Sequence, residues 1–483
     1  MHLLRTLFFS FSIVLLTGIF FSCKEDVDSL STDSSLKLTF SKDTVRFDTV
    51  FTTIKTATKR LLIYNHNNNA LNISSIKLMG ADNSFFRINV DGFSGDQSNV
   101  EIRGKDSMYV FVELTVDPQN EDNPIFIEDS IQFITNGNTQ YLRLEAYGQD
   151  VYIWDNKTIS QDTTLTDKRP FLIYDTLTIA KGSKLTVQEG TKLYFHKGAG
   201  LNVKGQVSAV GTVENPIVFR GDRTDNLFSD VPYDVGVTGQ WNGIRIDSIS
   251  YNNVFENVRI RNANYGIEFE NSLSEQKKAT LTNAIIHNMM GDCISATGCN
   301  IDFYNCQITN AQENCVTLIG GKYTFLHCTI ANYFRAVNES RATDSKTLYI
   351  SNIYNNSVLP LDECDFTNCI ISGSGSSEIT LFNTLNGNEQ TPFNHLFRYC
   401  LINVNGEDDE NFLENIWDES PNFFYLNTNY DYVFNFELDS ASVAINAAAR
   451  TYSASLPLDL NGISRLTDDG PDMGCYEWKQ SSE

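Results

Sequence analysis

The chain has 483 residues, of which 41% are hydrophobic and 12% aromatic, so it is long enough for two or three domains with buried cores. Its 60 acidic and 36 basic side chains give a formal net charge of −24 at pH 7. Because this charge repels phosphate backbones and anionic lipid surfaces, the composition argues against a nucleic-acid-binding protein.

Residues 1–22 have the pattern of a secretory signal peptide. A positively charged start, Met1 to Arg5, precedes the apolar run Leu7 to Phe21, which is too short to span a bilayer comfortably. The run closes on Phe20-Phe21-Ser22-Cys23, which resembles the lipobox of bacterial lipoproteins. In that family the cysteine is diacylated and becomes the first residue of the mature chain, so the resemblance predicts lipidation of Cys23. The alternative is an ordinary signal peptide with an incidental cysteine.

The residues behind Cys23 predict where the protein resides. Lys24-Glu25-Asp26 resembles the Lys-acid-acid export tag that sends some Gram-negative lipoproteins to the outer face of the outer membrane. We therefore expect an outer-membrane lipoprotein on the cell surface of a Gram-negative bacterium. It would be tethered through residues 23–35 and would contact the membrane through its lipid alone.

Residues 36–150 alternate between short strands and polar turns. Met108–Leu114 and Tyr141–Glu145 are two of these strands, and several at this spacing predict a β-sandwich. The run Leu71–Leu78, followed by Phe85–Ile88, resembles the immunoglobulin-like modules of bacterial surface proteins. Such a module is expected to act as a spacer or a docking domain.

The middle of the chain is a repeat array with one shared pattern of apolar residues. The last residues of successive repeats are 26, 22, 22, 41 and 31 positions apart. Twenty-two residues suffice for one coil of three short strands, and the interval of 41 holds either an extra coil, with Leu348–Ile350 as its strand, or a long loop. The six segments are Phe255–Ile260, Leu281–Ile286, Phe303–Ile308, Phe325–Ile330, Phe366–Ile371 and Phe397–Ile402.

Equivalent positions of stacked coils should form columns. Phe and Ile are expected to point inward, and Asn at a recurring bend can hydrogen-bond its equivalents in neighbouring coils. The first predicted Asn ladder comprises Asn257, Asn283, Asn305 and Asn368, with His327 and Tyr399 at the same position of two other repeats; a second comprises Asn262, Asn288, Asn310 and Asn332.

The flanks of the array carry a resemblance to a known fold. Gly182–Gly190, Gly200–Gly205 and Trp241–Ile246 resemble the first coils of the right-handed parallel β-helix superfamily, which includes pectate-lyase-like proteins. The tail, with Ser442–Asn446 and Pro471–Glu477, resembles the end segment of β-helix surface proteins of the choice-of-anchor class. The chain is therefore expected to be all-β, with an immunoglobulin-like sandwich over 36–150, a right-handed parallel β-helix over 151–440 and an end segment over 441–483. About nine to eleven coils would form a rod of about 50 Å.

Nine cysteines follow Cys23, an odd number that excludes complete pairing within the mature chain. Cys306, Cys328, Cys369 and Cys400 fall in one inward column, where parallel Cβ vectors suit a disulfide poorly. We expect buried thiols that fill space in the core.

The resemblance implies possible chemistry, because polysaccharide lyases of this fold use a Lys or Arg base with calcium, and hydrolases use clustered aspartates. The columns predicted to face solvent hold no carboxylate. They are Arg259, Ile285, Gln307, Thr329, Ile370 and Leu401, and beside them Arg261, His287, Thr309, Ala331, Ser372 and Asn403. Charge gathers only near the first of these coils, giving a candidate ligand-binding patch of Arg245, Asp247, Arg259, Arg261, Glu268, Glu270 and His287.

No catalytic residue and no metal ligand is assigned from the sequence. The acidic loops 407–410 and 468–472 could hold calcium, but neither has the spacing of an EF-hand, and solvated surface is the simpler interpretation. The favoured function is a non-catalytic surface protein whose β-helix face binds a polysaccharide or another surface protein. The alternatives are a polysaccharide lyase or glycoside hydrolase of the pectate-lyase-like fold, and a structural envelope protein.

Overall fold

The computed structural model describes residues 29–54, 56, 58–228, 231–383, 391–426, 431–467 and 469–479. Cys23, the predicted signal peptide and the predicted export tag lie outside this range. The chain divides into two compact units. The sandwich unit contains the described residues up to Pro118 together with Ile125–Gly148, and the β-helix unit contains Gln119–Pro124 and the residues from Gln149 onward. No helix in the described part of the chain has both the length and the apolar character needed to cross a membrane.

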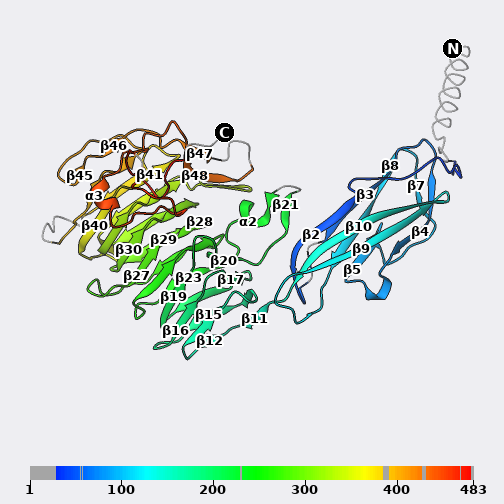
Figure 1. Cartoon of the computed structure of the whole chain (residues 1–483), viewed down its shortest axis with the longest axis horizontal. Coiled ribbons are helices and arrows are strands. Elements are labelled where there is room, and N and C mark those ends of the chain that lie inside the picture. Colours follow the sequence, from blue (N-terminus) through cyan, green and yellow to red (C-terminus); the bar gives the residue numbers. More distant parts are fainter. Residues whose placement is uncertain are drawn as a thin grey trace, which may run out of the picture. The chain divides into compact units, whose positions relative to one another are not determined.

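The sandwich unit consists of two five-stranded sheets that enclose one core (Figure 1). The order of the first is β1 (Thr39–Phe40), β3 (Lys59–Asn65), β8 (Asp106–Leu114), β5 (Phe86–Val90) and β6 (Phe93–Ser94); the order of the second is β2 (Thr44–Phe51), β10 (Asn138–Gln149), β9 (Ile125–Thr135), β4 (Leu71–Leu78) and β7 (Val100–Ile102). A short 3-10 helix, η2 (Ala81–Asn83), precedes β5.

Alternation along the strands explains this architecture. In β8, Val110, Val112 and Leu114 are buried in the core, whereas Tyr109 and Glu113 are exposed on the outer face. Asn136 and Gly137, with φ of 49° and 78°, form the two-residue turn between the antiparallel strands β9 and β10.

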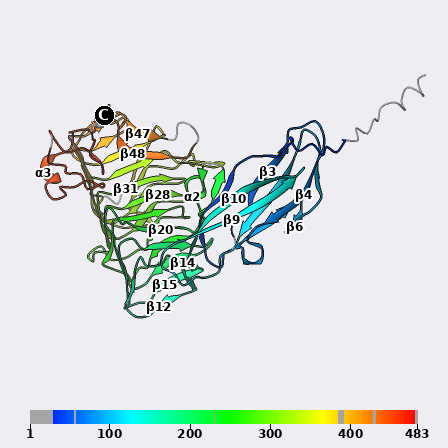
Figure 2. The same ribbon diagram turned by 45° about the vertical axis from the view of Figure 1, so that its right-hand side comes forward.

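The β-helix unit is built from three parallel sheets that the chain visits in turn (Figures 1 and 2). The eleven-stranded sheet contains β11 (Tyr152–Asp155), β14 (Phe171–Tyr174), β17 (Lys192–Phe195), β20 (Ile217–Gly221), β25 (Val258–Arg261), β28 (Ile285–Met289), β31 (Gln307–Ala311), β34 (Thr329–Asn332), β41 (Ile370–Gly373), β44 (Leu401–Ile402) and β46 (Ile416–Trp417). The nine-stranded sheet contains β12 (Thr158–Ile159), β15 (Thr176–Ile179), β18 (Gly200–Val203), β23 (Gly243–Ile246), β26 (Ile267–Phe269), β29 (Ile294–Thr297), β32 (Val316–Ile319), β37 (Leu348–Ser351) and β42 (Ile379–Phe382). The ten-stranded sheet contains β13 (Thr163–Leu165), β16 (Lys184–Val187), β19 (Gln206–Val210), β24 (Asn253–Glu256), β27 (Ala279–Thr282), β30 (Asn300–Tyr304), β33 (Gly321–Leu326), β40 (Leu361–Thr367), β43 (Leu396–Arg398) and β45 (Phe412–Leu413).

The parallel register confirms the all-β class and the β-helix. Phe303, for example, pairs with Phe325, and Phe325 with Phe366, each one coil apart. The interval of 41 residues is a single coil, since β34 leads through β37 and β40 to β41. The long-loop alternative is therefore the one found. This long coil contains two insertions, which form the hairpins β35 (Arg335–Ala336)–β36 (Glu339–Ser340) and β38 (Ile353–Tyr354)–β39 (Ser357–Val358).

The inward columns stack as predicted. The phenyl rings of Phe303, Phe325, Phe366 and Phe397 follow one another at centroid distances of 4.3, 4.5 and 4.6 Å with nearly parallel planes. The nine cysteines of the described residues are free and buried, which confirms the expected burial of the cysteine column.

The first Asn ladder is confirmed for Asn257, Asn283 and Asn305, whereas Asn368 bonds to His327 and the C-terminal segment; the second ladder is wrong. Asn283 donates to Asn257 Oδ1 at 3.2 Å and accepts from Asn305 Nδ2 at 3.1 Å, and φ at these three residues is 49° to 54°. In the second column the side chains bond to loop backbone instead. Asn262 donates to the carbonyls of Asp234 and Val237, because the insertion between β20 and β23 lies against this edge of the helix, and Asn332 donates to the carbonyl of Glu313 in the turn between β31 and β32.

A long C-terminal segment covers the later strands of the eleven-stranded sheet. It comprises the hairpin β47 (Phe423–Leu426)–β48 (Phe434–Leu438), the short helix α3 (Arg450–Ser453) and the loops up to Lys479 (Figure 2). A separate apolar cluster joins it to the sheet: Phe423, Phe436, Leu460, Met473 and Tyr476 pack with Ala331, Ile370 and Leu401.

Candidate binding cleft

The predicted patch is divided between two sheets. Arg245, Glu268 and Glu270 belong to the nine-stranded sheet or follow its strands, and Arg245 Nε donates to Glu270 Oε1 at 2.5 Å. Asp247 follows β23 in the same sheet. Arg259, Arg261 and His287 lie on the eleven-stranded sheet. The sequence therefore predicted one patch where there are two, because successive strands of a coil face different directions.

The two predicted solvent-facing columns have the expected register, but much of their length is buried. Gln307 and Thr329 are 8% and 1% exposed, and Ile370 and Leu401 are fully buried. The C-terminal segment covers them: Tyr476 donates its hydroxyl to Gln307 Oε1 at 2.6 Å, and the Cys475 amide donates to Thr329 Oγ1 at 3.1 Å. The prediction that these columns face solvent is therefore wrong for Gln307, Thr329, Ile370 and Leu401, since the apolar members of the columns require cover.

A cleft of about 460 Å³ remains between this cover and the first of these coils. Its floor includes Arg259, Arg261, His287 and Gln307. Its walls include Asp234 from α2 (Tyr233–Gly236), Tyr432 and Phe434 beside or in β48, and Tyr476. We call this the cationic cleft.

Asp234 forms ion pairs with two arginines, Arg220 and Arg261, which we call the inner arginines. Its carboxylate lies 2.8 Å from the Arg220 guanidinium and 2.6 Å from that of Arg261. Burial lowers the pKa of Arg261, and the neighbouring Asp234 opposes that shift. A carboxylate shared by two guanidiniums leaves an excess of positive charge.

Arg259 supplies the charge that a ligand can reach. Its side chain is exposed, and within the described residues it forms neither an ion pair nor a side-chain hydrogen bond. Two guanidiniums and one carboxylate thus line the cleft, in a protein whose net charge is −24. An anion is the ligand that this balance favours.

His287 lies beside the arginines in the register of the sheet, opposite Arg261 on the neighbouring strand. Burial, followed by the positive charges of Arg261 and Arg259, lowers the pKa of His287 to about 3. The ring is therefore neutral at physiological pH. His287 lines the cleft, and within the described part of the chain neither ring nitrogen has a hydrogen-bond partner.

Sequence reasoning missed Asp234, Tyr432 and Phe434. Asp234 lies in the insertion between β20 and β23, which also contains β21 (Asn226–Phe228) and β22 (Val231–Pro232). Phe219 and Ile260 pair one coil apart although 41 residues separate them, so the coil length was the available signal of an insertion. No sequence pattern around Tyr432 and Phe434 indicated that these two residues would line the cleft.

In the two acidic loops, Asp408 and Asp472 accept hydrogen bonds from the protein itself. Burial is the largest single influence on the pKa of Asp408 and raises it, but the hydrogen bonds that Asp408 accepts, among them those from Trp417 Nε1 and Asn415, together outweigh burial and lower the pKa. Asp472 accepts from the amides of Asn446 and Trp478. Among the described residues there is no group of three or more His, Cys, Asp or Glu side chains placed to hold a metal ion. Asp468 lies outside those residues.

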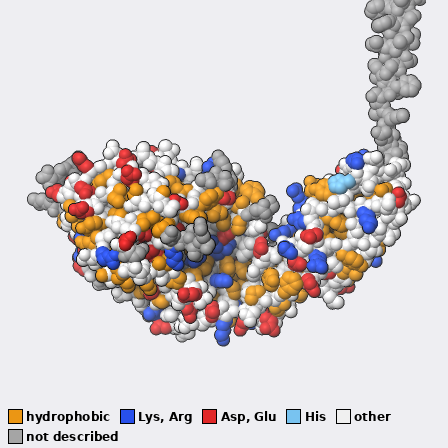
Figure 3. Space-filling view, turned by 45° about the horizontal axis from the view of Figure 1, so that its top comes forward, with side chains coloured by type: hydrophobic (Ala, Val, Ile, Leu, Met, Phe, Trp, Pro, Cys, Tyr) orange, Lys and Arg blue, Asp and Glu red, His pale blue; other side chains and the backbone are white. Residues whose placement is uncertain are grey.

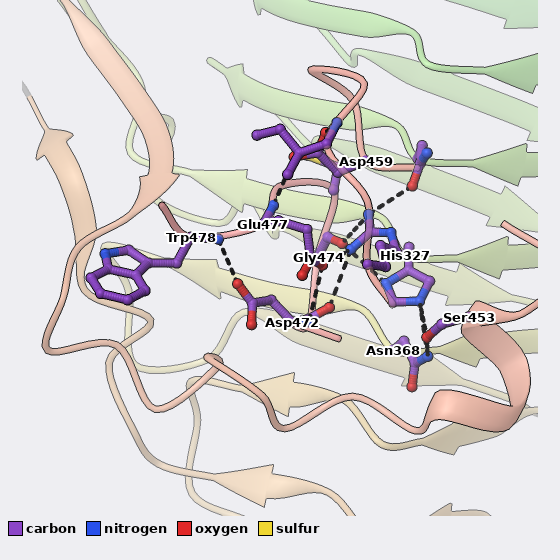
Figure 4. A network of polar contacts seen from close by, with 12 residues as sticks. His327, Asn368, Ser453, Asp459, Asp472, Gly474, Glu477 and Trp478 are labelled. Atoms are coloured by element: carbon purple, nitrogen blue, oxygen red, sulfur yellow. Dashed lines mark hydrogen bonds and ion pairs between the residues drawn. The ribbon is translucent and has the colours of Figure 1, made fainter. Parts of the chain in front are cut away.

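A buried polar network fixes the cover of the cleft to the β-helix (Figure 4). Arg465, fully buried, contacts Glu477 Oε1 at 2.5 Å and donates to Asn305 Oδ1 at 2.8 Å. The imidazole of His327 lies 2.8 Å from Ser453 Oγ. Two positions of the Asn column therefore bond the tail, which makes the cover an integral part of the unit.

No protein-family model and no curated protein matches the chain. Among solved structures, pectate lyase Pel9A is similar over 68% of this chain and 88% of its own, with 14% identity and a TM-score of 0.33. A family 123 glycoside hydrolase from Clostridium perfringens matches over 25% of this chain and 30% of its own, with 8% identity and a TM-score of 0.18. A protein of unknown function from Porphyromonas gingivalis W83 matches over 26% and 59%, with 10% identity and a TM-score of 0.18. The matched parts span less than two thirds of the last two proteins, and the fold assignment rests on the sheets of the molecule itself.

Proposed function

We propose that this chain is a lipid-anchored cell-surface protein that binds an anionic polysaccharide in the cationic cleft. The observation that carries the proposal is Arg259, an exposed guanidinium without a protein partner in the described residues, beside Arg261 and between aromatic walls. Carboxylate or sulfate groups of a glycan would pair with the guanidiniums, and sugar rings would contact Tyr432 and Phe434. Many weak contacts of this kind give modest affinity.

The anchor and the finer fold assignments belong to the same proposal. Lipidation at Cys23 and the export tag behind it would place both units outside the cell, where polysaccharides are encountered. An immunoglobulin-like sandwich would act as the spacer, and a right-handed β-helix with a choice-of-anchor-type end segment would carry the cleft. The right hand is the one that parallel strand crossovers favour.

Binding of polygalacturonate and alginate to the full-length chain in detergent tests the proposed ligand class. Arg259→Ala should weaken binding roughly tenfold, because it removes a charge-assisted contact, and added salt should weaken it further. Arg245→Ala is the matched control: it removes an arginine of the same predicted patch that lies on another sheet, next to Glu270. Equal effects of both substitutions, or no binding of either polymer, would refute the proposal and favour a protein partner or a structural envelope role.

Lyase activity is the second candidate, and His287 favours it. A neutral imidazole opposite Arg261 could accept the proton from the carbon beside a uronate carboxylate, while the glycosidic C–O bond on the next carbon breaks and its oxygen leaves with a proton from water. Burial is the main cause of the low pKa of His287, and a bound carboxylate would offset the smaller contribution of the two arginines. Absorbance of unsaturated uronate products, lost in His287→Ala, would establish this activity. Binding without such products, and without new reducing ends, would leave the protein a non-catalytic binder.

A further inference from the structure

The sandwich unit has a cleft of its own, on the outer face of its first sheet. The cleft has a volume of about 580 Å³, and Phe111 of β8 and Arg87 and Asn89 of β5 are among its lining residues. Ligand sites in proteins are typically concave, with an apolar surface and a few polar groups that fix orientation. We call it the sandwich cleft, and it shares no residue with the cationic cleft.

Phe111 borders the sandwich cleft and has no aromatic partner across the sheet. Its neighbours in register are Arg60 on β3 and Asn89 on β5. On its own strand it stacks against Tyr109, with 5.9 Å between ring centroids and 21° between planes, and the guanidinium of Arg60 lies 5.3 Å from the centroid of Tyr109. Phe111 lines the cleft, whereas Tyr109 stacks beside it on the same face of β8.

Isolated exposed rings are ordinary on protein surfaces, and Figure 3 shows hydrophobic side chains scattered among charged ones over both units. The sandwich cleft differs because polar groups with unused hydrogen-bonding capacity surround the ring. Arg87 and Glu113 pair in register, yet no ion pair joins them within the described residues. Arg87 donates Nη1 to the carbonyls of Ser84 and Phe86, and among the described residues its Nε and Nη2 have no hydrogen-bond partner. Within the same residues, Glu113 accepts a single side-chain hydrogen bond, from Thr58 at Oε1.

The charge of the sandwich cleft selects among ligands. Asp82, Asp96 and Glu113 line it against one cation, Arg87, so its balance is negative and an anionic glycan is disfavoured. Neutral sugars fit both features, because their C–H faces pack on aromatic rings and their hydroxyl groups both donate and accept hydrogen bonds.

We infer that the sandwich unit binds a neutral oligosaccharide, with one pyranose ring on Phe111 and its hydroxyl groups hydrogen-bonded to Arg87 and Glu113. The sandwich would then be a second binding module rather than only a spacer. This inference is independent of the cationic cleft, since it concerns a different unit and a cleft with the opposite charge balance.

Calorimetric titration of the full-length chain in detergent with cellohexaose, xylohexaose and mannohexaose tests the inference. At least one of these should bind, and Phe111→Ala should raise its Kd roughly tenfold. Arg87→Ala should also weaken binding, which keeps the test decisive if Phe111→Ala is poorly folded. Phe126→Ala is the matched control, because it removes another phenyl ring, which is 48% exposed but lies on the other sheet. Like Phe111, Phe126 has a tyrosine neighbour: its ring centroid lies 5.3 Å from that of Tyr147.

The outcomes separate this site from the cationic cleft. Binding of a neutral hexasaccharide that Phe111→Ala weakens and Arg259→Ala leaves unchanged supports the inference. It would be overturned if none of the three sugars binds, if Phe126→Ala weakens binding as much as Phe111→Ala, or if Phe111→Ala abolishes binding of polygalacturonate. Loss of polygalacturonate binding in Arg259→Ala alone would concern only the proposed function.

Discussion

The carboxylate of Asp234 lies 2.6 Å from the guanidinium of Arg261, joining an inserted helix to a strand of the eleven-stranded sheet. Arg220 contacts the same carboxylate from the preceding coil. This arrangement holds the insertion against the sheet and offsets the charge of the inner arginines. Arg259 is then the guanidinium most open to an anionic ligand.

Removing the Asp234 charge should destabilise the β-helix unit. Asp234→Asn leaves two largely buried guanidiniums without a carboxylate, and loss of one partner of such a group costs about 3 kcal/mol of the free energy of unfolding. Chemical denaturation measures the change. Glu268→Gln is the control, since Glu268 lies 3.9 Å from Arg245 and both are well exposed, so its effect should stay within about 0.5 kcal/mol. Equal losses in the two variants would contradict the assigned role of Asp234.

The Asn ladder contributes through both conformation and hydrogen bonds, and two substitutions separate them. Asn283 has φ of 53°, which glycine adopts freely and alanine does not. Asn283→Gly should lose the two ladder hydrogen bonds, at about 1 kcal/mol each. Asn283→Ala should lower the free energy of unfolding by about 1 kcal/mol more than Asn283→Gly does, because alanine adopts the positive φ of this position unfavourably. Thermal and chemical denaturation of both variants would show whether alanine is the more damaging.

The repeat could be predicted because residues that stack in one column of successive coils recur at the same position of successive sequence repeats. Phe303 and Phe325 recur at the same position of successive segments and stack in the core, and Asn283 and Asn305 recur at one bend. Such columns depend only on the neighbouring coils, so local pattern suffices to find them.

The cationic cleft depends on contacts that the repeat does not encode. Gln307 and Tyr476 bond across 169 residues, and the repeat pattern says nothing about a tail folding back. Arg245 and Arg259 both point outward from strands in which buried and exposed residues alternate. This alternation does not reveal that the two strands belong to different sheets. Ile370 and Leu401 in the outward column were the signal that a cover exists.

Cys328 should behave as an apolar core residue. It is fully buried in the stacked column, and burial raises its pKa well above the ordinary value, so the thiol is protonated and unreactive in the native protein. Cys328→Ser should destabilise by roughly 1–3 kcal/mol, because the hydroxyl is more costly to bury. Mass spectrometry of unfolded, non-reduced protein should find Cys306, Cys328, Cys369 and Cys400 alkylated. Peptides linked through a disulfide between any two of them would contradict this role.

Lipid anchoring is testable apart from any ligand. Cys23→Ala should abolish incorporation of labelled fatty acid and release the protein from the membrane fraction, because the acylated residue is absent. Replacing Lys24, Glu25 and Asp26 with alanine should leave labelling intact and reduce digestion by protease added to intact cells. Unchanged labelling of Cys23→Ala would exclude the lipobox interpretation.

The packing of the C-terminal cover should weaken as pH rises. Burial raises the pKa of Glu477 to about 7 from 4.5, although Arg465 opposes the shift, and burial also raises the pKa of Asp459. The folded state therefore binds more protons than the unfolded state between about pH 4.5 and 7, so stability is highest below this window and declines through it.

Hydrogen exchange of residues 458–467 and 469–478 should accordingly be faster at pH 8 than at pH 5.5, after correction for the intrinsic pH dependence of exchange. Glu477→Gln keeps the shape and the hydrogen-bond acceptor of the neutral acid but cannot ionise, so it should remove most of the difference between the two pH values. Asp439→Asn, in the neighbouring turn after β48, is the control and should leave the difference unchanged. Protection that rises with pH in the unmodified protein would show that ionised Glu477, paired with Arg465, is the stabilising form.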